Sequence, residues 1–389
     1  MPHMAMLKTP CKSSFCLKFF LNFFIWLLIA PQTQAIEISG SYRNLLFQHK
    51  SSINQTVTTD LNRFRLNLDG NHKAWQWRLS YDHELLYGGV VRDPIFAIAQ
   101  QIPDATWLDI NANIAASSAF NWQHSVYRGW LAYQTDAWQV TIGRQRLAWG
   151  SGRIWNPTDR FNPVQVTALE VDQKLGVDTA YITHSYSDFG SLQWVATPGS
   201  FKQNAQRKWA LRWQDTIAQT DMALWLGEIG QERILAIDVT GNLGDAAGRL
   251  EWQQSWHGTQ GNFGQLTLGL DGTWVSELFP EGLYLAAEYF YNGLAQPNTG
   301  LPLQTSMLHS SSAQLLGILA GYDLTPLWRM ELTWLLDLNK TSWFMAPNLR
   351  WSASENMEVS CFAQFPSGNT GSEFSAFNDL LGINLEYYF

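Results

Sequence analysis

Four arginines and one aspartate gather in a short stretch of the chain: Arg144, Arg146, Arg153, Asp159 and Arg160. Arginine presents its donors in a planar fork, which matches two oxygens of a carboxylate or a phosphate. These side chains could therefore bind a small anion together. The stretch also has a structural interpretation, in which the arginines pair with backbone carbonyls and neighbouring carboxylates. The two interpretations are compatible.

An alternating strand leads into this stretch, with apolar Trp138, Val140 and Ile142 interleaved with more polar residues. If the alternation continued, Arg144 and Arg146 would share the face of Trp138. On a lipid-facing surface this would cost about 2–4 kcal/mol for each arginine near the bilayer midplane. We therefore expect a β-bulge near Gly143, where a glycine tolerates the bend. Further on, glycines and Asn-Pro pairs end the strand and favour a loop over 150–174. In the structural interpretation, Trp149 just before this loop and Trp155 within it would anchor the interface.

The first 35 residues have the features of a secretory signal peptide. They contain Lys8, Lys12 and Lys18 and no acidic residue, followed by an apolar run over 19–30 and a small-residue ending at Ala35. The run is shorter than the ~20 residues that a membrane-spanning helix needs. We expect cleavage after Ala35, which would leave 36–389 as the mature chain.

The composition of 36–389 excludes several classes of protein. Only Cys361 remains, so no intramolecular disulfide can form, and loss of the three lysines changes the formal charge from −8 to −11. A chain this acidic is a poor partner for nucleic acid. The sequence is 46% hydrophobic with 20 Trp, 13 Tyr and 21 Phe, yet its mean hydropathy is −0.17. A transmembrane β-barrel reconciles these values, because one face contacts lipid and the other contacts water.

Alternating segments of about ten residues, the length of a tilted membrane strand, follow one another along the chain. We expect eighteen antiparallel strands, with sixteen as the alternative, at 36–48, 60–69, 74–86, 123–134, 137–149, 175–186, 191–197, 206–215, 220–226, 233–240, 246–256, 263–275, 282–292, 312–322, 326–336, 342–351, 357–364 and 379–389. Every second connection is short and the others include all the long ones, as in an even-stranded barrel with periplasmic termini. A soluble sandwich or propeller would leave the tryptophan-rich faces exposed, and no repeat of blade length occurs.

The strand phases place a set of charged residues on the inner face. As pore-lining or solute-binding candidates we select Arg63, Arg65, Arg78, Arg128, Glu288, Arg329 and Glu331, in addition to the arginines and Asp159 of the loop. Opposed basic and acidic rows would orient a solute in a narrow lumen. The alternative for each residue is an ordinary polar barrel interior in which the charges pair with one another.

The C-terminal ten residues, 380–389, alternate apolar side chains and end at Phe389. They resemble the signal by which the barrel assembly machinery recognises outer-membrane barrels of Gram-negative bacteria. The combination Gly143-Arg144-Gln145 with Trp149-Gly150, followed by Asn-Pro, is similar to a motif of porin-type and alginate-export-type barrels. The resemblance implies a Gram-negative outer-membrane location and either a channel for small solutes or an exporter.

Together these features predict an outer-membrane channel for small polar or anionic solutes, with the loop after the fifth strand as its constriction. A closed structural or adhesion barrel is the first alternative. A lipid hydrolase is the second, but the adjacent pairs His184-Ser185 and His124-Ser125 point to opposite faces of a strand, and the histidines lack metal-ligand spacing. We therefore expect no enzyme activity, no cofactor and no metal. Expected partners are outer-membrane lipid and lipopolysaccharide, the assembly machinery, a small solute and, as an open alternative, further copies of the chain.

Overall fold

The computed structural model describes residues 36–51, 53–94, 96, 106–162, 167–171, 173, 176–199, 206–258, 261–295 and 310–389. The expected signal peptide, 1–35, lies outside these residues. Within the described part of the chain, no helix has both the length and the apolar character needed to cross a bilayer. The structure is built almost entirely from antiparallel strands.

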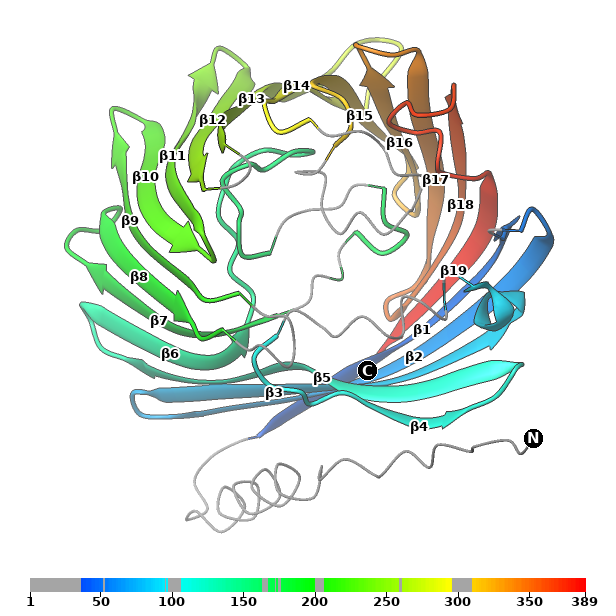
Figure 1. Ribbon diagram of the computed structural model, residues 1–389, viewed down its shortest axis with the longest axis horizontal. Coiled ribbons are helices and arrows are strands. Elements are labelled where there is room, and N and C mark those ends of the chain that lie inside the picture. The colour runs from blue at the N-terminus through cyan, green and yellow to red at the C-terminus, as the bar shows by residue number, and fades with distance from the viewer. Residues whose placement is uncertain are drawn as a thin grey trace, which may run out of the picture.

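Eighteen long strands form the wall of the protein (Figure 1). In chain order they are β1 (Glu37–Lys50), β2 (Thr56–His72), β3 (Trp75–Gly88), β5 (Phe120–Gln134), β6 (Trp138–Gln145), β7 (Val177–Ser185), β8 (Ser191–Thr197), β9 (Lys208–Ile217), β10 (Thr220–Ile229), β11 (Glu232–Leu243), β12 (Ala246–His257), β13 (Gly261–Trp274), β14 (Leu283–Asn292), β15 (Gln314–Thr325), β16 (Trp328–Asp337), β17 (Ser342–Ser354), β18 (Met357–Gly368) and β19 (Leu380–Tyr388). A 3₁₀ turn, η1 (Gly89–Arg92), follows β3.

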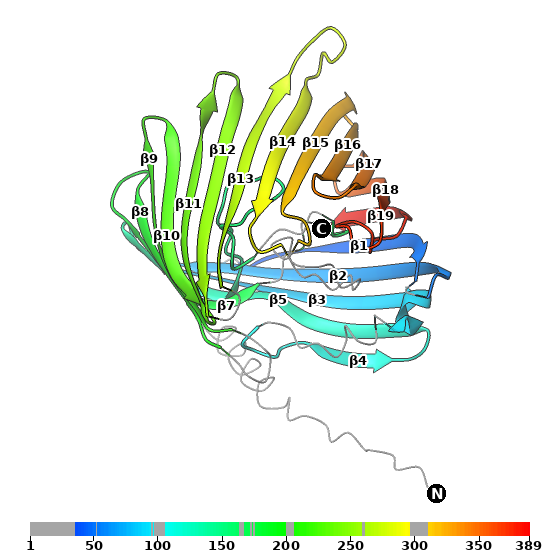
Figure 2. The ribbon, with the colours of Figure 1, turned by 45° about the horizontal axis from the view of Figure 1, so that its top comes forward.

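Pairing of the first strand with the last closes the barrel. Each long strand pairs antiparallel with its neighbours, and β1 pairs with β19 from Ser41 opposite Tyr388 to His49 opposite Leu380. The C-terminal strand therefore lies beside the first strand, as Figure 2 shows. Closure removes the two free edges that an open sheet would expose. The predicted antiparallel barrel of about eighteen strands is confirmed, and the sixteen-strand alternative is wrong.

One short strand, β4 (Ala112–Ala116), was not expected from the sequence. It pairs with the Asn121–His124 part of β5, on the edge that β6 does not reach. β6 stops at Gln145 because the chain turns inward there, so the predicted continuation of this strand to Trp149 is wrong. Because β6 ends early, part of one edge of β5 has no partner from β6. The connection after β3 contributes β4, which pairs with this part of the edge.

The bulge expected near Gly143 lies in the neighbouring strand instead. The pairing of β6 with β5 and β7 runs without a shift of register through Gly143, which has φ +125°, a conformation that favours glycine. The shift occurs in β5, where Ser80 and Tyr81 of β3 face Arg128 and Val126 and leave Tyr127 unpaired. The expectation named the right region of the barrel but the wrong strand.

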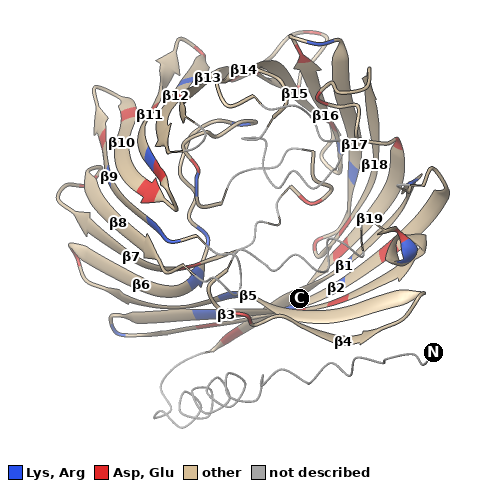
Figure 3. Cartoon of the chain, in the orientation of Figure 1, with Lys and Arg blue, Asp and Glu red and all other residues tan. Residues whose placement is uncertain are grey.

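The two faces of the wall differ as the alternation requires. Outward positions include Phe64, Ile142, Leu268 and Trp334, which are 43%, 61%, 43% and 38% exposed. Inward positions are polar, and several are fully buried by the chain inside the ring, among them Glu251, Gln253, Gln265 and Glu288. Charged residues are sparse along the strands, where both basic and acidic side chains occur (Figure 3). Basic and acidic residues also occur on the chain inside the ring.

Candidate functional site

The chain enters the lumen directly after β6. Residues 146–162, which we call the inner loop, lie inside the ring of strands instead of extending the wall (Figure 1). This is the loop that the sequence predicted to be the constriction, since β6 corresponds to the fifth predicted strand. Its position is determined by two apolar clusters and two buried carboxylates on the wall.

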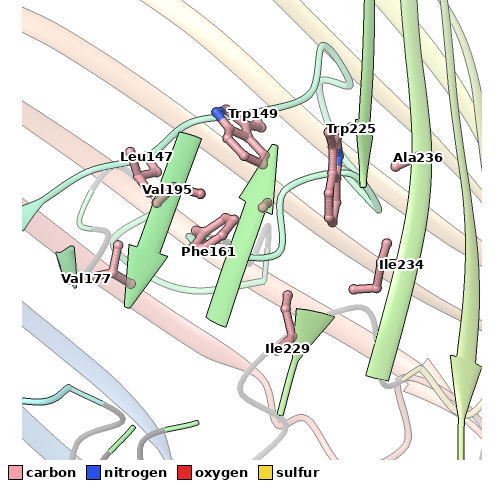
Figure 4. Packing of buried hydrophobic residues seen from close by; sticks show 10 residues of the cluster. Leu147, Trp149, Phe161, Val177, Val195, Trp225, Ile229, Ile234 and Ala236 are labelled. Carbon is pink, nitrogen blue, oxygen red and sulfur yellow. The ribbon is translucent and has the colours of Figure 1, made fainter. Parts of the chain in front are cut away.

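The first apolar cluster attaches the start and the end of the inner loop to β7–β11. Trp149 and Phe161 are 4% and 3% exposed, their ring centroids lie 5.1 Å apart, and Trp149 also contacts Trp225 at 5.5 Å. Figure 4 shows these rings among the aliphatic side chains of the strands. The other members are Leu147, Val177, Val195, Ala210, Ile229, Ile234 and Ala236. Burial of each large side chain favours the docked loop by about 1.5–3 kcal/mol.

The first carboxylate is that of Glu251 on β12, which is 0% exposed. One oxygen accepts from the backbone N–H groups of Ser151 at 2.7 Å and Gly152 at 2.6 Å. The other accepts from the N–H of Thr158 at 3.1 Å and from its hydroxyl at 2.6 Å. Gly150, with φ +89°, makes this approach possible, because a Cβ there would lie 2.8 Å from the carboxylate.

The second carboxylate is that of Glu288 on β14, which is 1% exposed. It accepts from three successive backbone N–H groups of the inner loop, those of Arg153, Ile154 at 2.8 Å and Trp155 at 3.1 Å. Successive N–H groups that converge on an anion form a backbone nest. Here the anion is a side chain of the wall, so the nest fixes the loop.

The second apolar cluster attaches the middle of the inner loop to β14–β17. Ile154 and Trp155 are 0% and 1% exposed, and Trp155 stacks on Phe290 with ring centroids 5.6 Å apart. The cluster is completed by Leu315, Leu335, Phe344 and Phe374. Trp149 and Trp155, which the sequence suggested as anchors at the interface, hold the loop to the inner wall instead.

Two of the predicted loop arginines pair with carboxylates of the wall. Arg153 lies 3.2 Å from Asp271, and Arg160 pairs with Glu232. Partial burial lowers the pKa of Arg153, but the hydrogen bond and the charge of Asp271 act in the opposite direction, and its pKa lies above the ordinary value. The side chain of Arg153 is 46% exposed, so it remains accessible from the lumen.

Asp159 and Glu288, both predicted to contact solute, form structural contacts. Asp159 is 1% exposed and accepts from the backbone N–H of Asn162 at 2.8 Å, while the Asn162 side chain accepts from Leu147 N–H at 2.7 Å. Glu288 is occupied by the nest described above. Their burial argues against direct contact with solute, because a solute could not reach either carboxylate without undocking the loop.

Arg144 is also buried, at 4% exposure, and lines none of the described cavities. It forms a two-point ion pair with Asp178, at 2.9 and 3.0 Å, and donates to the backbone oxygen of Leu108 at 2.7 Å. The connection after β3 covers it, so the cost of an arginine on this strand is reduced by pairing and not by a bulge. Arg146 is exposed.

Four arginines lie close together on the inner face of β1–β5, near a carboxylate of the loop. We call Arg43, Arg63, Arg65 and Arg128 the arginine row. Glu170, which follows the inner loop, accepts from Arg43 at 2.8 Å and from Arg63 at 3.0 Å. Arg65 forms two hydrogen bonds of 2.6 Å with Asp82. The guanidinium groups of Arg65 and Arg128 lie 3.5 and 3.9 Å from the ring centre of Tyr127. Arg63, Arg65 and Arg128 lie on the inner face, as the strand phases predicted, and the structure also brings them together.

Cavities surround this arginine row. The largest of the described cavities, of about 700 Å³, is lined by Arg63, Arg65, Asp82 and Glu84 together with Glu170. Neighbouring cavities of about 450 and 340 Å³ share Arg43 with each other, and the larger of the two also contains Glu331 and Arg350. Volumes of 300–1,000 Å³ are typical of sites for small molecules. The lumen beside the inner loop therefore has room for a solute and charged groups that could orient it.

The remaining predicted residues lie nearer the ends of the strands. Arg78 pairs with Asp69 at 2.6 Å with 48% of its side chain exposed. Arg329 forms ion pairs with Asp323 at 2.9 Å and with Glu331 at 3.0 Å. Arg43 and Glu170 were not among the residues predicted from the sequence. The inward alternation of Ser39, Ser41 and Arg43 could have identified the first, but no local pattern indicates the second.

No protein-family model and no curated protein matches the chain. Solved structures do resemble it in fold. OccK5 (OpdH) of Pseudomonas aeruginosa superposes with a TM-score of 0.60 at 10% identity, covering 91% of this chain and 97% of its own. OccAB2 of Acinetobacter baumannii has a TM-score of 0.60 at 9% identity, covering 92% and 98%. OccK2 (OpdF) of P. aeruginosa, solved in complex with glucuronate, has a TM-score of 0.58 at 10% identity, covering 91% and 97%.

Proposed function

We propose that the chain is an outer-membrane channel for small anionic or polar solutes, and that the inner loop is its constriction. One observation carries this proposal. The inner loop is fixed to the wall of β7–β17, while the wall of β1–β5 keeps a cavity of about 700 Å³ with the arginine row. A loop held on one side narrows a pore without filling it.

The arginine row favours carboxylates as the solute class. Arg43 and Arg63 already hold the carboxylate of Glu170 between them. The same guanidinium groups would suit the carboxylate of a solute, because arginine forms planar two-point contacts with such groups. The glucuronate complex of OccK2, a protein of the same fold, makes glucuronate a suitable first probe.

The outer membrane of a Gram-negative bacterium is the proposed location. The outward face of the barrel presents exposed Leu, Ile and Trp side chains on most strands, which suits contact with lipid and lipopolysaccharide. The N-terminal 35 residues would act as a cleaved export signal. The last strand, which ends beside the exposed ring of Phe389, would be the segment that the barrel assembly machinery recognises.

Liposome swelling tests the solute class. Reconstituted protein should admit glucuronate faster than glucose, because the arginine row attracts the carboxylate. Arg63→Gln should reduce this preference several-fold, by removing a charge from the row. Arg78→Gln is the matched control, since Arg78 is also an inward arginine and lies on the neighbouring strand β3. The side chain of Arg78 is paired with Asp69 and lies away from the described cavities. It should leave the preference unchanged.

Equal rates for glucuronate and glucose would contradict anion selectivity. No swelling with any solute, from protein shown to be folded, would favour the alternative of a closed structural or adhesion barrel. Lipid hydrolysis would then be the next activity to assay.

A further inference from the structure

Polar side chains gather on the outward face of the barrel across β1 and β2. Asn44 donates to Asp60 at 2.6 Å and to Asn62 at 3.1 Å, and Asn62 donates to Asp60 at 2.9 Å. The hydroxyl of Tyr42 donates to Asn62 at 2.5 Å. Asn44, Asn62 and Asp60 thus form one hydrogen-bonded cluster, in which two amide side chains lie around the Asp60 carboxylate.

The polar surface continues on β3 and β5. His83 and His124 lie opposite each other in register, with stacked rings whose centroids are 6.2 Å apart. The hydroxyl of Tyr81 lies 2.9 Å from Nδ1 of His124. We call Asn44, Asp60, Asn62, His83 and His124 the outer polar patch.

The strand alternation places Asp60 and His83 on the outside; His124 also borders the cavity of about 700 Å³, but its ring contacts Tyr81 and His83 on the outer face. Thr59 and Leu61 line the largest cavity, so Asp60 between them points away from the lumen. On β3, Asp82 and Glu84 line the same cavity, and His83 between them likewise points outward. The cross-strand partner of His83 is Phe64, which is 43% exposed.

The patch extends from one end of the belt that would contact lipid, where Asp60 is in register with Tyr87, into the belt at His83. His83 lies between Trp75 and Tyr87 on the same face of β3, and these two exposed aromatic residues mark the two ends of the belt. Other sectors of the wall present apolar residues at such positions, among them Leu224, Leu250, Leu268, Leu285 and Met330. Polar and ionisable groups within a membrane are typically covered by protein or water. The outer polar patch therefore needs a cover that lipid chains do not provide.

We propose that a second copy of this chain covers the outer polar patch, so that the barrels associate side by side in the membrane. This inference rests on the membrane location and not on transport. The patch is self-complementary, because the carboxylate and amides lie at one end and the imidazoles at the other. Two copies related by rotation about an axis along the membrane normal place the Asp60 end of the patch on one copy opposite the histidine end of the patch on the other. Asp60 of one copy would then face the histidines of the next.

The chemistry of the patch favours a protein over lipopolysaccharide. The phosphate groups of lipopolysaccharide would meet the carboxylate of Asp60, which repels them. The patch contains no lysine or arginine that would offset this repulsion. A second copy supplies imidazole donors for the carboxylate, and polar contacts of this kind associate protein segments within membranes.

Disulfide trapping between two differently tagged copies tests the proposal. One copy carries Asn62→Cys and the other His124→Cys, both with Cys361→Ser because Cys361 is exposed. After mild oxidation of intact outer membranes, a linked product that carries both tags and disappears on reduction is expected. The control pair is Leu224→Cys with Leu250→Cys, outward residues on β10 and β12 that are 41% and 37% exposed. This pair should give no linked product.

Adding Asp60→Asn to both copies should lower the linked fraction by about threefold, because the carboxylate no longer attracts the imidazoles. Heat-modifiable migration on gels would confirm that each variant is a folded barrel. The proposal is overturned if folded copies of the patch pair give no linked product, or if the control pair links equally well. A patch cysteine that links only to a different protein would also overturn it.

Discussion

Thr158 of the inner loop donates both its backbone N–H and its hydroxyl to a single oxygen of Glu251, at 3.1 and 2.6 Å. The other oxygen of the same carboxylate is bound by two further N–H groups of the loop. This part of the inner loop is therefore held by one buried side chain of the wall, in addition to the Glu288 nest and the two apolar clusters.

Replacement of Glu251 by alanine should release this part of the inner loop. Loss of this acceptor leaves buried N–H groups of the loop without a partner, which costs about 1–3 kcal/mol for each group. We expect noisier and larger single-channel currents and faster cleavage of the loop by added protease. The control is Ser80→Ala, a buried polar position on β3 that lines none of the described cavities. Currents and cleavage identical to those of the wild type would contradict the role of Glu251.

Truncation of Trp155 should lower the stability of the barrel. This side chain is 1% exposed and stacked on Phe290, and such a change typically costs about 3–5 kcal/mol. Urea unfolding in detergent, followed by tryptophan fluorescence, measures the effect. Trp138→Ala provides a control, because Trp138 is 50% exposed on the outer face. A larger loss of stability for Trp138→Ala than for Trp155→Ala would show that the inner cluster does not hold the loop.

Glu170→Gln should make the lumen more anion-selective. The carboxylate neutralises part of the charge of Arg43 and Arg63, which are 11% and 12% exposed. Loss of this carboxylate should shift the reversal potential in a salt gradient toward the equilibrium potential of the anion. It should also strengthen block by glucuronate by about tenfold, equivalent to 1.4 kcal/mol. Asp188→Asn, a change of charge in the turn between β7 and β8, is the control. A shift toward cations would disprove this arrangement of charges.

Arg144→Ala should affect stability more than selectivity. The substitution leaves the buried carboxylate of Asp178 without its arginine, which typically costs about 3–5 kcal/mol. Asp178→Asn added to Arg144→Ala should recover part of the loss, because the stranded charge is gone. Urea unfolding measures both variants, and the reversal potential should stay close to that of the wild type. A lost anion preference with normal stability would instead place Arg144 in the pore.

The strands could be predicted from the sequence because alternation is a local property. All eighteen long strands occur where the pattern placed them, with ends that differ by a few residues. β4 was missed because it is short and depends on the edge of β5 that β6 leaves free. The inward arginines Arg63, Arg65 and Arg128 followed from the same alternation.

The anchoring of the inner loop could not be predicted, because it joins residues far apart in sequence. Glu251 and Glu288 bind the loop from positions about a hundred residues or more beyond it. The sequence shows two inward carboxylates and a loop rich in glycine, and nothing in it pairs one with the other. The structural interpretation anticipated that the arginines pair with carbonyls and carboxylates, as Arg144 does, but the partners and the burial of Arg144 and Asp159 were not foreseen.

The most direct test of the channel is the single-channel conductance of the refolded protein in a planar bilayer while glucuronate is added. We predict discrete steps of current that glucuronate blocks and that an equal concentration of glucose does not. Block should weaken in Arg63→Gln. A folded barrel without conductance, or with steps indifferent to glucuronate and to Arg63, would contradict the proposal of an arginine-lined channel narrowed by the inner loop.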